Sequence, residues 1–417
     1  MQQDMAIVNL KVSVPEAVKA LAKFKQNRVK ALEDLSADIK GAVSSAINGL
    51  LHAEMNVFLG EPEQADNKRN GYEDREYALK HVGAIRIRMP VDRKRRFASV
   101  VVPPREQVDP RVKEDMAVLH LAGLSTRTLA MVSKRILGVE VGKDAVSVSL
   151  SHVRDRALAF LDRSLAGKRY TTLFIDGTNF RVQRRGSTEK EPSLVVLGLD
   201  DRHCYSVLAM EPGAKDSAEC WRAVFASLRT RQLDMQAVRL GVMDGLPGLE
   251  TAFREFFPKA VTARCWVHAL RNAIAKAPSR LREPFKLLTR GVMYAKSEDA
   301  ARIAFQELKS SMGDDGVKAV RCLEKDLESL LTHYRFEQSL WRALKTTNPI
   351  ERVNKEMKRR TKSMETVGEA TLEVVLAFTA IRLEYGWQTT PVNSARVQGL
   401  KGVRFNSIEA AAQDLLH

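Results

Sequence analysis

The sequence predicts an α/β protein in which helices cover a mixed β-sheet, preceded by an N-terminal region of helices and a β-hairpin. Two observations predict this class. Apolar residues recur every three or four positions in the early part of the chain, which is typical of amphipathic helices. After Tyr170, short apolar segments of strand length alternate with helical segments, which favours a sheet with crossover helices.

The composition supports a folded protein of two or three domains. The chain has 417 residues, of which 44% are hydrophobic and 28% charged, so it can bury a sizeable core. Its 67 Lys and Arg residues exceed its 51 Asp and Glu residues, which gives a formal net charge of +16. This surplus favours an anionic partner, either nucleic acid or an anionic membrane surface.

The sequence shows no targeting or membrane signal. Residues 1–10 lack the basic start and apolar core of a signal peptide, and no apolar run approaches the roughly 18 residues of a spanning helix. We therefore expect an intracellular protein. The four cysteines are far apart and form no CxxC pair, which predicts reduced thiols, mostly in the core, rather than a disulfide framework or a zinc ribbon.

The first strong helical pattern runs from Asp34 to Leu59 and ends at Gly60 and Pro62. Its apolar residues form one stripe, at Leu35, Ile39, Val43, Ile47, Leu51, Met55 and Phe58. Such a stripe predicts one buried face. A polar connection, Glu61–Arg75, follows the helix.

A basic β-hairpin is predicted next. Apolar and basic residues alternate over Ile85–Met89, which indicates a half-buried strand, and an apolar strand, Ala98–Val102, follows a turn near Pro90. Only one acid, Asp92, interrupts the basic residues of this segment, which are Arg86, Arg88, Arg93, Lys94, Arg95 and Arg96. Two interpretations remain open, a solvated hairpin and a surface that contacts phosphates.

Residues Pro110–Leu161 have the rhythm of a helix-turn-helix unit. A first helix ends at Ala122–Leu124, Ser125 begins a second, and a third starts near Lys143. Beyond its first turn the third helix, the candidate recognition helix, has no acid before Asp155. Its polar residues there are Ser147, Ser149, Ser151 and His152. A three-helix packing unit without a DNA role has the same pattern, so both interpretations remain open.

The region after Tyr170 predicts the mixed sheet, with antiparallel strands first and β-α-β units after them. The predicted strands are Thr171–Ile175, Asn179–Arg185, Leu194–Leu199, Cys204–Met210, Ala237–Met243 and Ala260–Cys265. The predicted helices are Ser217–Arg231, Pro247–Phe257 and Val267–Ala277. Helical periodicity from Ser279 to Lys345 then predicts an all-α insertion.

Two aspartates follow apolar strands of this sheet. Asp176 comes directly after Thr171–Ile175, and Asp244 after Ala237–Met243. If a right-handed crossover places these strands side by side and parallel, the two carboxylates face each other. Divalent cations keep such a pair ionised, and oxygen ligands select Mg²⁺ or Mn²⁺. The alternative is that each Asp-Gly pair is an ordinary turn.

A third carboxylate, Glu351, opens a basic helix. Asn348 and Pro349 form a helix start, in which Glu351 is placed to complete a capping box. The basic residues that follow are Arg352, Lys355, Lys358, Arg359, Arg360 and Lys362. Such a helix is suited to lie on phosphates, and one carboxylate can serve both a cap and a metal ion.

The segments around these carboxylates are Phe174–Gly177, Met243–Leu249 with Cys265–His268, and Asn348–Arg352 with Lys358–Thr361. Together they resemble the Mutator-like transposases of bacterial insertion sequences. The N-terminal segments Arg69–Gly71, Ile85–Pro90 with Asp92 and Arg93, and Ala122–Arg127 are similar to the same family. The resemblance spans roughly Leu50 to Trp387.

The resemblance implies a ribonuclease-H-like catalytic domain, with helices on both faces of its sheet, and a DDE triad. Residue by residue, the triad falls on Asp176, Asp244 and Glu351, as catalytic residues and as ligands of two Mg²⁺ or Mn²⁺ ions. It also places Cys265, His268, Arg271 and Asn272 near the active site. A zinc site is the alternative for the cysteine and histidine of this set, with Cys204 and His203 as distant further ligands.

The implied function is that of a DNA transposase. Such an enzyme binds the terminal inverted repeats of its element and target DNA, cleaves DNA with metal ions, and transfers a strand by attack of the 3′-hydroxyl. We expect a homodimer, to which the helix Asp34–Leu59 contributes, no membrane association, and a place at the nucleoid in a bacterial cytoplasm. Two alternatives are a non-transposing nuclease of the same fold and a non-catalytic DNA-binding protein derived from a transposase.

The expected domain boundaries follow these patterns. An N-terminal helical region takes residues 1–65, a basic β-hairpin region 66–108, and a helix-turn-helix-like DNA-binding domain 109–165. The catalytic domain takes 166–278 and 346–390, the all-α insertion 279–345, and a C-terminal tail 391–417. DNA contacts are expected from the basic hairpin and from the basic helix that Glu351 opens.

Overall fold

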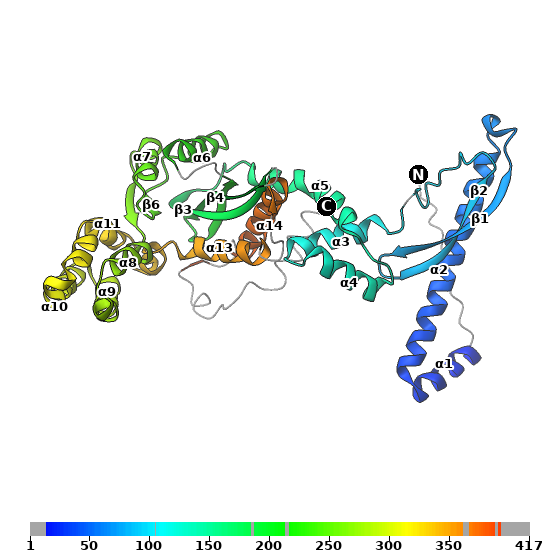
Figure 1. Ribbon diagram of the computed structural model, residues 1–417, viewed down its shortest axis with the longest axis horizontal. Coiled ribbons are helices and arrows are strands. Elements are labelled where there is room, and N and C mark those ends of the chain that lie inside the picture. Colours follow the sequence, from blue (N-terminus) through cyan, green and yellow to red (C-terminus); the bar gives the residue numbers. More distant parts are fainter. Residues whose placement is uncertain are drawn as a thin grey trace. The chain divides into compact units, whose positions relative to one another are not determined.

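The computed structural model describes residues 14–104, 106–184, 187–212, 217–361, 367–387 and 391–392. They belong to two compact units, whose elements Figure 1 labels. The first unit includes the chain up to Met116 and Thr126–Val146, and the second includes Ala117–Ser125 and the chain from Ser147. The start of the chain, Lys362 and residues 393–417 of the expected tail lie outside the described residues.

A long helix and a β-hairpin form the core of the first unit. Helix α1 (Val14–Gln26) precedes α2 (Arg28–Leu59), which begins earlier than the sequence predicts. Asn27 caps α2, because its Oδ1 accepts a hydrogen bond from the Lys30 amide at 3.1 Å. On the hairpin of β1 (Arg69–Leu79) and β2 (Gly83–Asp92), the buried residues that pack with Leu51 of α2 are Tyr77, Ile85, Ile87 and Met89.

The pairing of β1 with β2 corrects two expectations. Part of the expected polar connection Glu61–Arg75 belongs to β1, and Ala98–Val102 forms no strand. The first residues of β1 are exposed and polar, so the sequence carries no strand pattern there, and only the pairing partner makes them a strand. Val102 is buried in the same cluster without strand pairing, so its apolar character reflects packing alone.

Three helices follow where the sequence predicts them: α3 (Pro110–Leu121), α4 (Thr126–Leu137) and α5 (Lys143–Leu161). Gly123, in the first turn between them, has φ +114°, a conformation that favours glycine. α3 and α5 are each divided between the two units. A helix-turn-helix role in DNA binding therefore stays a prediction.

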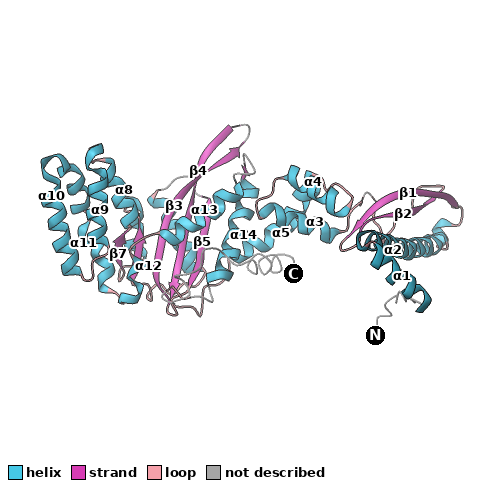
Figure 2. Cartoon of the chain, turned by 90° about the horizontal axis from the view of Figure 1, so that it is seen from below, coloured by secondary structure: helices cyan, strands magenta, loops and turns pink. Residues whose placement is uncertain are grey.

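A mixed sheet forms the centre of the second unit, as predicted. Its strands are β3 (Tyr170–Arg184), β4 (Ser187–Asp200), β5 (Tyr205–Pro212), β6 (Leu240–Met243) and β7 (Val261–Arg264), and the short β8 (Val367–Gly368) also pairs with β3. The spatial order is β5-β4-β3-β6-β7. β3, β4 and β5 are antiparallel neighbours, whereas β6 and β7 are parallel to β3. Figure 2 shows the strands in magenta.

Alternating side chains place a hydrophobic cluster on each face of this sheet. Leu173 and Ile175 belong to one cluster, together with residues of α6 (Ala218–Thr230) and α7 (Pro247–Phe256). Phe174 belongs to the other, together with residues of α13 (Asn348–Thr361) and α14 (Glu369–Trp387). Figure 1 shows the two helix pairs on opposite sides of the strands.

β3 is one continuous strand, whereas the sequence predicts two strands that are interrupted at Asp176. It pairs with β4 from Tyr170 to Arg184, so Asp176 lies inside it. β6 is shorter, and its last pairing with β3 joins Val242 to Phe174. Asp176 therefore lies just beyond the paired part of its parallel neighbour, although its own strand continues.

The insertion is built from helices, as predicted. Its helices are α9 (Arg282–Met293), α10 (Glu298–Glu324), α11 (Leu327–Leu331) and α12 (Trp341–Leu344), and α8 (Trp266–Ala275) precedes them. Short 3-10 helices cover Pro62–Gln64 in the first unit and Ser279–Leu281, Thr332–Arg335 and Gln338–Leu340 in the insertion. A separate hydrophobic cluster forms the insertion's core. In the described part of the chain, no helix is long and apolar enough to cross a membrane.

Candidate active site

Asp176 and Asp244 lie near the end of the parallel pairing between β3 and β6. The last paired residues are Phe174 and Val242, so each aspartate lies two residues further along the chain, Asp176 within β3 and Asp244 directly after β6. Alternation along β3 places Asp176 on the face of Phe174, which α13 and α14 cover. The charges of both aspartates act on His268. Asp176 is buried, with 6% of its surface exposed. The predicted parallel arrangement of these two strands is confirmed.

Asp244 also shapes the turn that it begins. Its Oδ1 accepts a hydrogen bond from the Leu246 amide at 3.1 Å, which makes an Asx turn. Gly245 between them has φ +84°, a conformation that favours glycine. The turn interpretation is therefore correct for Asp244, but the turn engages only one of its two carboxylate oxygens. For Asp176 it is wrong, because β3 continues through that residue.

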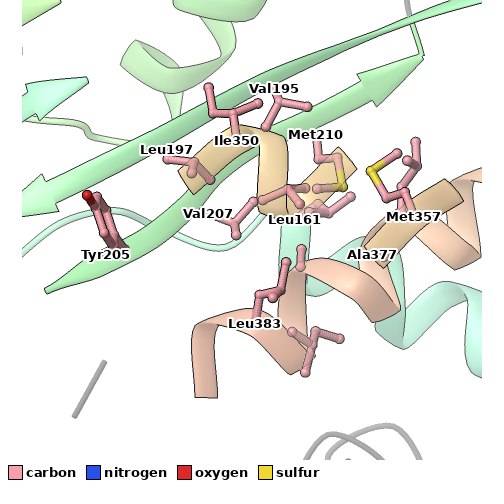
Figure 3. Close-up of a cluster of buried hydrophobic side chains, with 14 of the residues drawn as sticks. Leu161, Val195, Leu197, Tyr205, Val207, Met210, Ile350, Met357, Ala377 and Leu383 are labelled. Carbon is pink, nitrogen blue, oxygen red and sulfur yellow. The ribbon is translucent and has the colours of Figure 1, made fainter. Parts of the chain in front are cut away.

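Glu351 lies in the first turn of α13, on the face of the sheet that carries the aspartates. Its neighbour Ile350 is buried in the cluster that Figure 3 shows, near Val195 of β4, and anchors this end of the helix on the sheet. The Glu351 side chain is 30% exposed. Among the described residues its carboxylate has one partner, Arg271 of α8, at 3.9 Å.

The start of α13 differs from the prediction by one residue. The Glu351 amide donates to the Thr347 carbonyl at 3.0 Å, so Thr347 rather than Asn348 is the residue that precedes the helix. The Glu351 carboxylate is directed to Arg271 and does not close a capping box. The capping-box alternative is therefore wrong, and the carboxylate is not committed to the helix backbone.

Cys265 and His268 lie beside the two aspartates. Burial by itself would raise the pKa of the Cys265 thiol, but hydrogen bonds with His268 and Thr347 outweigh burial and hold that pKa below its usual value. The hydrogen bond with Cys265 raises the pKa of His268 against the opposing effect of burial, and the charges of Asp176 and Asp244 add to this rise.

In this structure the side chains of the three carboxylates are not close enough together to share one metal ion. Within the described residues, no three His, Cys, Asp or Glu side chains are close enough together to hold a metal ion. This applies to Asp176, Asp244 and Glu351, and equally to a zinc site at Cys265 and His268. The parallel pairing of β3 and β6 brings the two aspartates to the same end of these strands, whereas the Glu351 side chain is directed to an arginine.

Asp92 organises the basic loop Arg93–Arg96 of the first unit. Its buried carboxylate accepts hydrogen bonds from the amides of Lys94, Arg96 and Phe97 at 3.0 to 3.1 Å, and from the side chain of Asn67 at 2.7 Å. Burial would raise the pKa of this carboxyl, but these hydrogen bonds hold it below its usual value.

In the sequence Asp92 is the lone acid of a basic segment, and its structural role was not predicted. The signal was present, because an aspartate just before a polar turn commonly accepts hydrogen bonds from the amides that follow it. Around it the predicted basic residues are all exposed: Arg86, Arg88, Arg93, Lys94, Arg95 and Arg96.

The basic residues of α13 divide into an exposed and a buried group. Lys355, Lys358 and Arg359 are exposed, and Arg352 is partly buried. None of the Arg360 side chain is exposed, and its guanidinium lies 2.8 Å from the Glu356 carboxylate. The structure thus corrects the expected role of Arg360 as a phosphate contact, because it belongs to the face of α13 that packs on α14.

The fold and this site define a basic α/β protein with an acidic centre. One aspartate lies in β3, another directly follows its parallel neighbour β6, and a helical insertion separates them from a glutamate that opens a basic helix. Comparison with known proteins identifies the family. The profile of the Mutator family of transposases matches residues 15–389, so the chain belongs to this family.

Relatives of this chain come from several bacteria. The transposase for insertion sequence element IS905 of Lactococcus lactis is 29% identical, over 79% of this chain and 84% of its own length. The transposase for IS256 in transposon Tn4001 of Staphylococcus aureus is 25% identical, over 78% of this chain and 84% of its own. Among solved structures, the Drosophila P element transposase strand transfer complex aligns with a TM-score of 0.40 and 10% identity, over 70% of this chain and 94% of that chain.

Proposed function

We propose that this protein is the transposase of an insertion sequence, which cleaves DNA at the ends of its element and joins those ends to a new site. The observation that carries the proposal is that Asp176 lies in β3 and Asp244 directly follows its parallel neighbour β6, in a chain of the Mutator family. The sheet order β5-β4-β3-β6-β7, with three antiparallel strands followed by two parallel ones, supports the ribonuclease-H-like fold that the resemblance implies.

The donor set fits divalent ions of the magnesium type. Asp176, Asp244 and Glu351 offer only oxygen ligands, which Mg²⁺ and Mn²⁺ prefer. Two carboxylates close to each other repel when both are ionised, and a bound cation relieves this repulsion. The two aspartates would hold the ions from the sheet and Glu351 from α13. Two such ions would supply an activated water and stabilise the leaving 3′-oxygen.

The chain's own side chains prepare the site for DNA. The His268 imidazole lies near both aspartates, whose charges raise its pKa. Arg271, whose side chain is 66% exposed, contacts Glu351 in the absence of DNA, and Asn272 beside it is exposed as well. When Glu351 turns toward the aspartates, the Arg271 guanidinium becomes available to a DNA phosphate.

The exposed basic surfaces fit the negatively charged backbone of double-stranded DNA. We assign backbone contacts to Arg86, Arg88, Arg93, Lys94, Arg95 and Arg96 of the first unit, and to Arg352, Lys355, Lys358 and Arg359 of α13. Recognition of terminal inverted repeats needs base contacts as well, for which α5 is the candidate. Because an element has two ends, we propose a homodimer, to which the exposed Leu35 and Ile39 of α2 contribute.

Joining of pre-cleaved DNA ends separates this function from its alternatives. Incubation of the purified protein with labelled pre-cleaved ends of its own element, target DNA and Mg²⁺ should give strand-transfer products, because the same site then uses the 3′-hydroxyl as nucleophile. A non-transposing nuclease would leave the ends unjoined. A non-catalytic DNA-binding protein would retard the ends in a gel without forming a product.

Replacement of Asp92 by Asn should weaken DNA binding although it removes a negative charge. In the wild type, the backbone amides of the loop donate to the two Asp92 carboxylate oxygens. In the variant, the side-chain NH2 group is itself a donor and cannot accept these hydrogen bonds, so the basic loop loses its fixed shape. Removal of a negative charge would otherwise strengthen phosphate binding. We expect Kd, measured by fluorescence anisotropy over a range of salt concentrations, to rise about tenfold.

Asp66→Asn is the matched control, because it makes the same change in charge at the edge of the loop. Asp66 is exposed and pairs with the Lys94 side chain, without contacting the loop amides. This variant should bind DNA as tightly as the wild type or more tightly. Equal affinities of a folded Asp92→Asn variant and of Asp66→Asn would show that the shape of the loop does not matter for DNA binding.

A further inference from the structure

Two segments that are far apart in the chain meet at Cys265. This residue follows β7, and its partner segment, 345–347, leads into α13. The Trp266 amide donates to the Lys345 carbonyl at 3.0 Å. Next to this bond, the Thr347 amide and hydroxyl each lie 3.3 Å from the Cys265 Sγ and donate to it. The sulfur thus accepts the hydrogen bond that a backbone carbonyl accepts where two chain segments pair.

Backbone hydrogen bonds extend this link to both sides of the candidate site. The Cys265 amide donates at 2.8 Å to the carbonyl of Met243, the residue before Asp244. On the other side, the Thr347 carbonyl accepts the hydrogen bond of the Glu351 amide at 3.0 Å. Cys265 therefore lies between the strand end that carries Asp244 and the helix start that carries Glu351.

Burial makes the Cys265 sulfur the acceptor on which this junction depends. Cys265 is 0% exposed and Thr347 is 1% exposed, so bulk water cannot replace the sulfur as the acceptor for the Thr347 groups. A buried amide or hydroxyl that loses its acceptor is destabilised by the full cost of its desolvation. An alanine at position 265 would therefore disturb the backbone around Thr347 more than its small change in volume suggests.

The insertion explains why such a link is needed. The chain leaves the sheet at Cys265, builds the helices of the insertion with their own hydrophobic core, and returns only at Thr347. Ile350 packs α13 on the sheet, and the contact of Cys265 with Thr347 adds a tie at the point where the chain returns from the insertion, next to Glu351.

We propose that Cys265 is a positioning residue, which ties the start of α13 to the ends of β6 and β7 and so keeps Glu351 within reach of Asp176 and Asp244. This role rests on the proposed function of the three carboxylates. In this role Cys265 acts through Thr347, and its hydrogen bond with His268 is a separate contact.

Hydrogen–deuterium exchange of the full-length protein, without metal or DNA, tests the link itself. Cys265→Ala removes the acceptor of the Thr347 amide, and we expect faster exchange in a peptide that covers residues 345–352, while peptides of β3 and β4 keep their wild-type rates. Cys265→Ser keeps an acceptor at this position and should restore slow exchange in part. Unchanged exchange in Cys265→Ala would overturn the proposal.

Cleavage kinetics test the positioning. Cys265→Ala and Thr347→Val should each lower kcat for cleavage of element ends, Cys265→Ala by about tenfold or more, with Kd for DNA within about twofold of the wild type. Cys265→Ser should recover part of the lost kcat. The double variant should cleave about as well as Cys265→Ala alone, because both changes act on one contact. Cys204→Ala replaces another buried cysteine outside the site and should keep the wild-type kcat.

The outcomes separate the two proposals. Cleavage by Asp176→Asn, Asp244→Asn and Glu351→Gln would overturn the proposed function, whatever the exchange data show. Inactivity of those three, together with wild-type cleavage by Cys265→Ala, would overturn the positioning role alone. If Cys265→Ala does not fold, the same test uses Thr347. Thr347→Val removes the hydroxyl that donates to the sulfur, and Thr347→Ser keeps a hydroxyl, so only Thr347→Val should lower kcat.

Discussion

Asp176→Asn, Asp244→Asn and Glu351→Gln should each abolish Mg²⁺-dependent cleavage of a terminal-repeat substrate while DNA binding stays measurable. Each substitution keeps the size of the side chain but removes the charge that would hold a cation. Loss of an activated water is worth several kcal/mol of transition-state stabilisation, so we expect the rate to fall by roughly a thousandfold or more. Gel analysis of labelled DNA gives the rate, and anisotropy gives Kd.

Asp234→Asn provides the matched control for these carboxylates. Like Asp244, Asp234 accepts backbone hydrogen bonds in a turn of the second unit, from the amides of Gln236 and Ala237 at 3.1 and 3.2 Å. It is exposed and lies outside the candidate site. Its substitution should leave cleavage at the wild-type rate. Substantial Mg²⁺-dependent cleavage by any one of the three site variants would contradict the triad.

Replacement of Glu356 by Ala should cause a large loss of stability, although Glu356 lies in the helix that faces the site. Its carboxylate lies 2.8 Å from Arg360 and 2.5 Å from Arg382, whose side chains are 0% and 6% exposed. Removal of the acid leaves two buried guanidinium groups without their counter-charge, which costs about 3–5 kcal/mol. Urea unfolding of the variant and the wild type measures the free-energy difference.

The stabilising effect of Glu356 should also depend on pH. Burial would raise the pKa of Glu356, but the hydrogen bonds from Arg360 and Arg382 outweigh burial and lower it below the usual glutamate value. A carboxyl whose pKa is lower in the folded state stabilises the protein above its unfolded-state pKa, and this stability is lost as the pH falls through the folded-state pKa. The difference in unfolding free energy between the wild type and Glu356→Ala should therefore decrease as the pH is lowered.

Glu255→Ala is the control for this ion-pair cluster. Glu255 forms an equally short ion pair, 2.7 Å from Arg222, but both side chains are more than 40% exposed. Exposed ion pairs add little to stability, so this variant should unfold close to the wild type. Equal unfolding free energies of Glu356→Ala and Glu255→Ala would show that burial of the arginines does not make Glu356 essential.

The sequence by itself determined most elements of the fold and the identity of the candidate site residues. Helical periodicity and apolar runs located the helices of the insertion and the strands around Phe174 and Val242, because these patterns depend on which side chains face the core. The two Asp-Gly pairs and the helix start at Glu351 could be recognised from short stretches of sequence alone. The family resemblance then joined them, and the match to the Mutator family confirmed it.

Only the tertiary structure decided features that depend on distant partners. β3 continues through Asp176 because β4 pairs along its whole length, and β1 is a strand because β2 pairs with its polar residues. Arg360 is buried at the contact with α14, where Glu356 supplies its counter-charge. Cys265 meets Thr347 across 82 positions of sequence. Pairing and burial arise between segments, so no local pattern could reveal them.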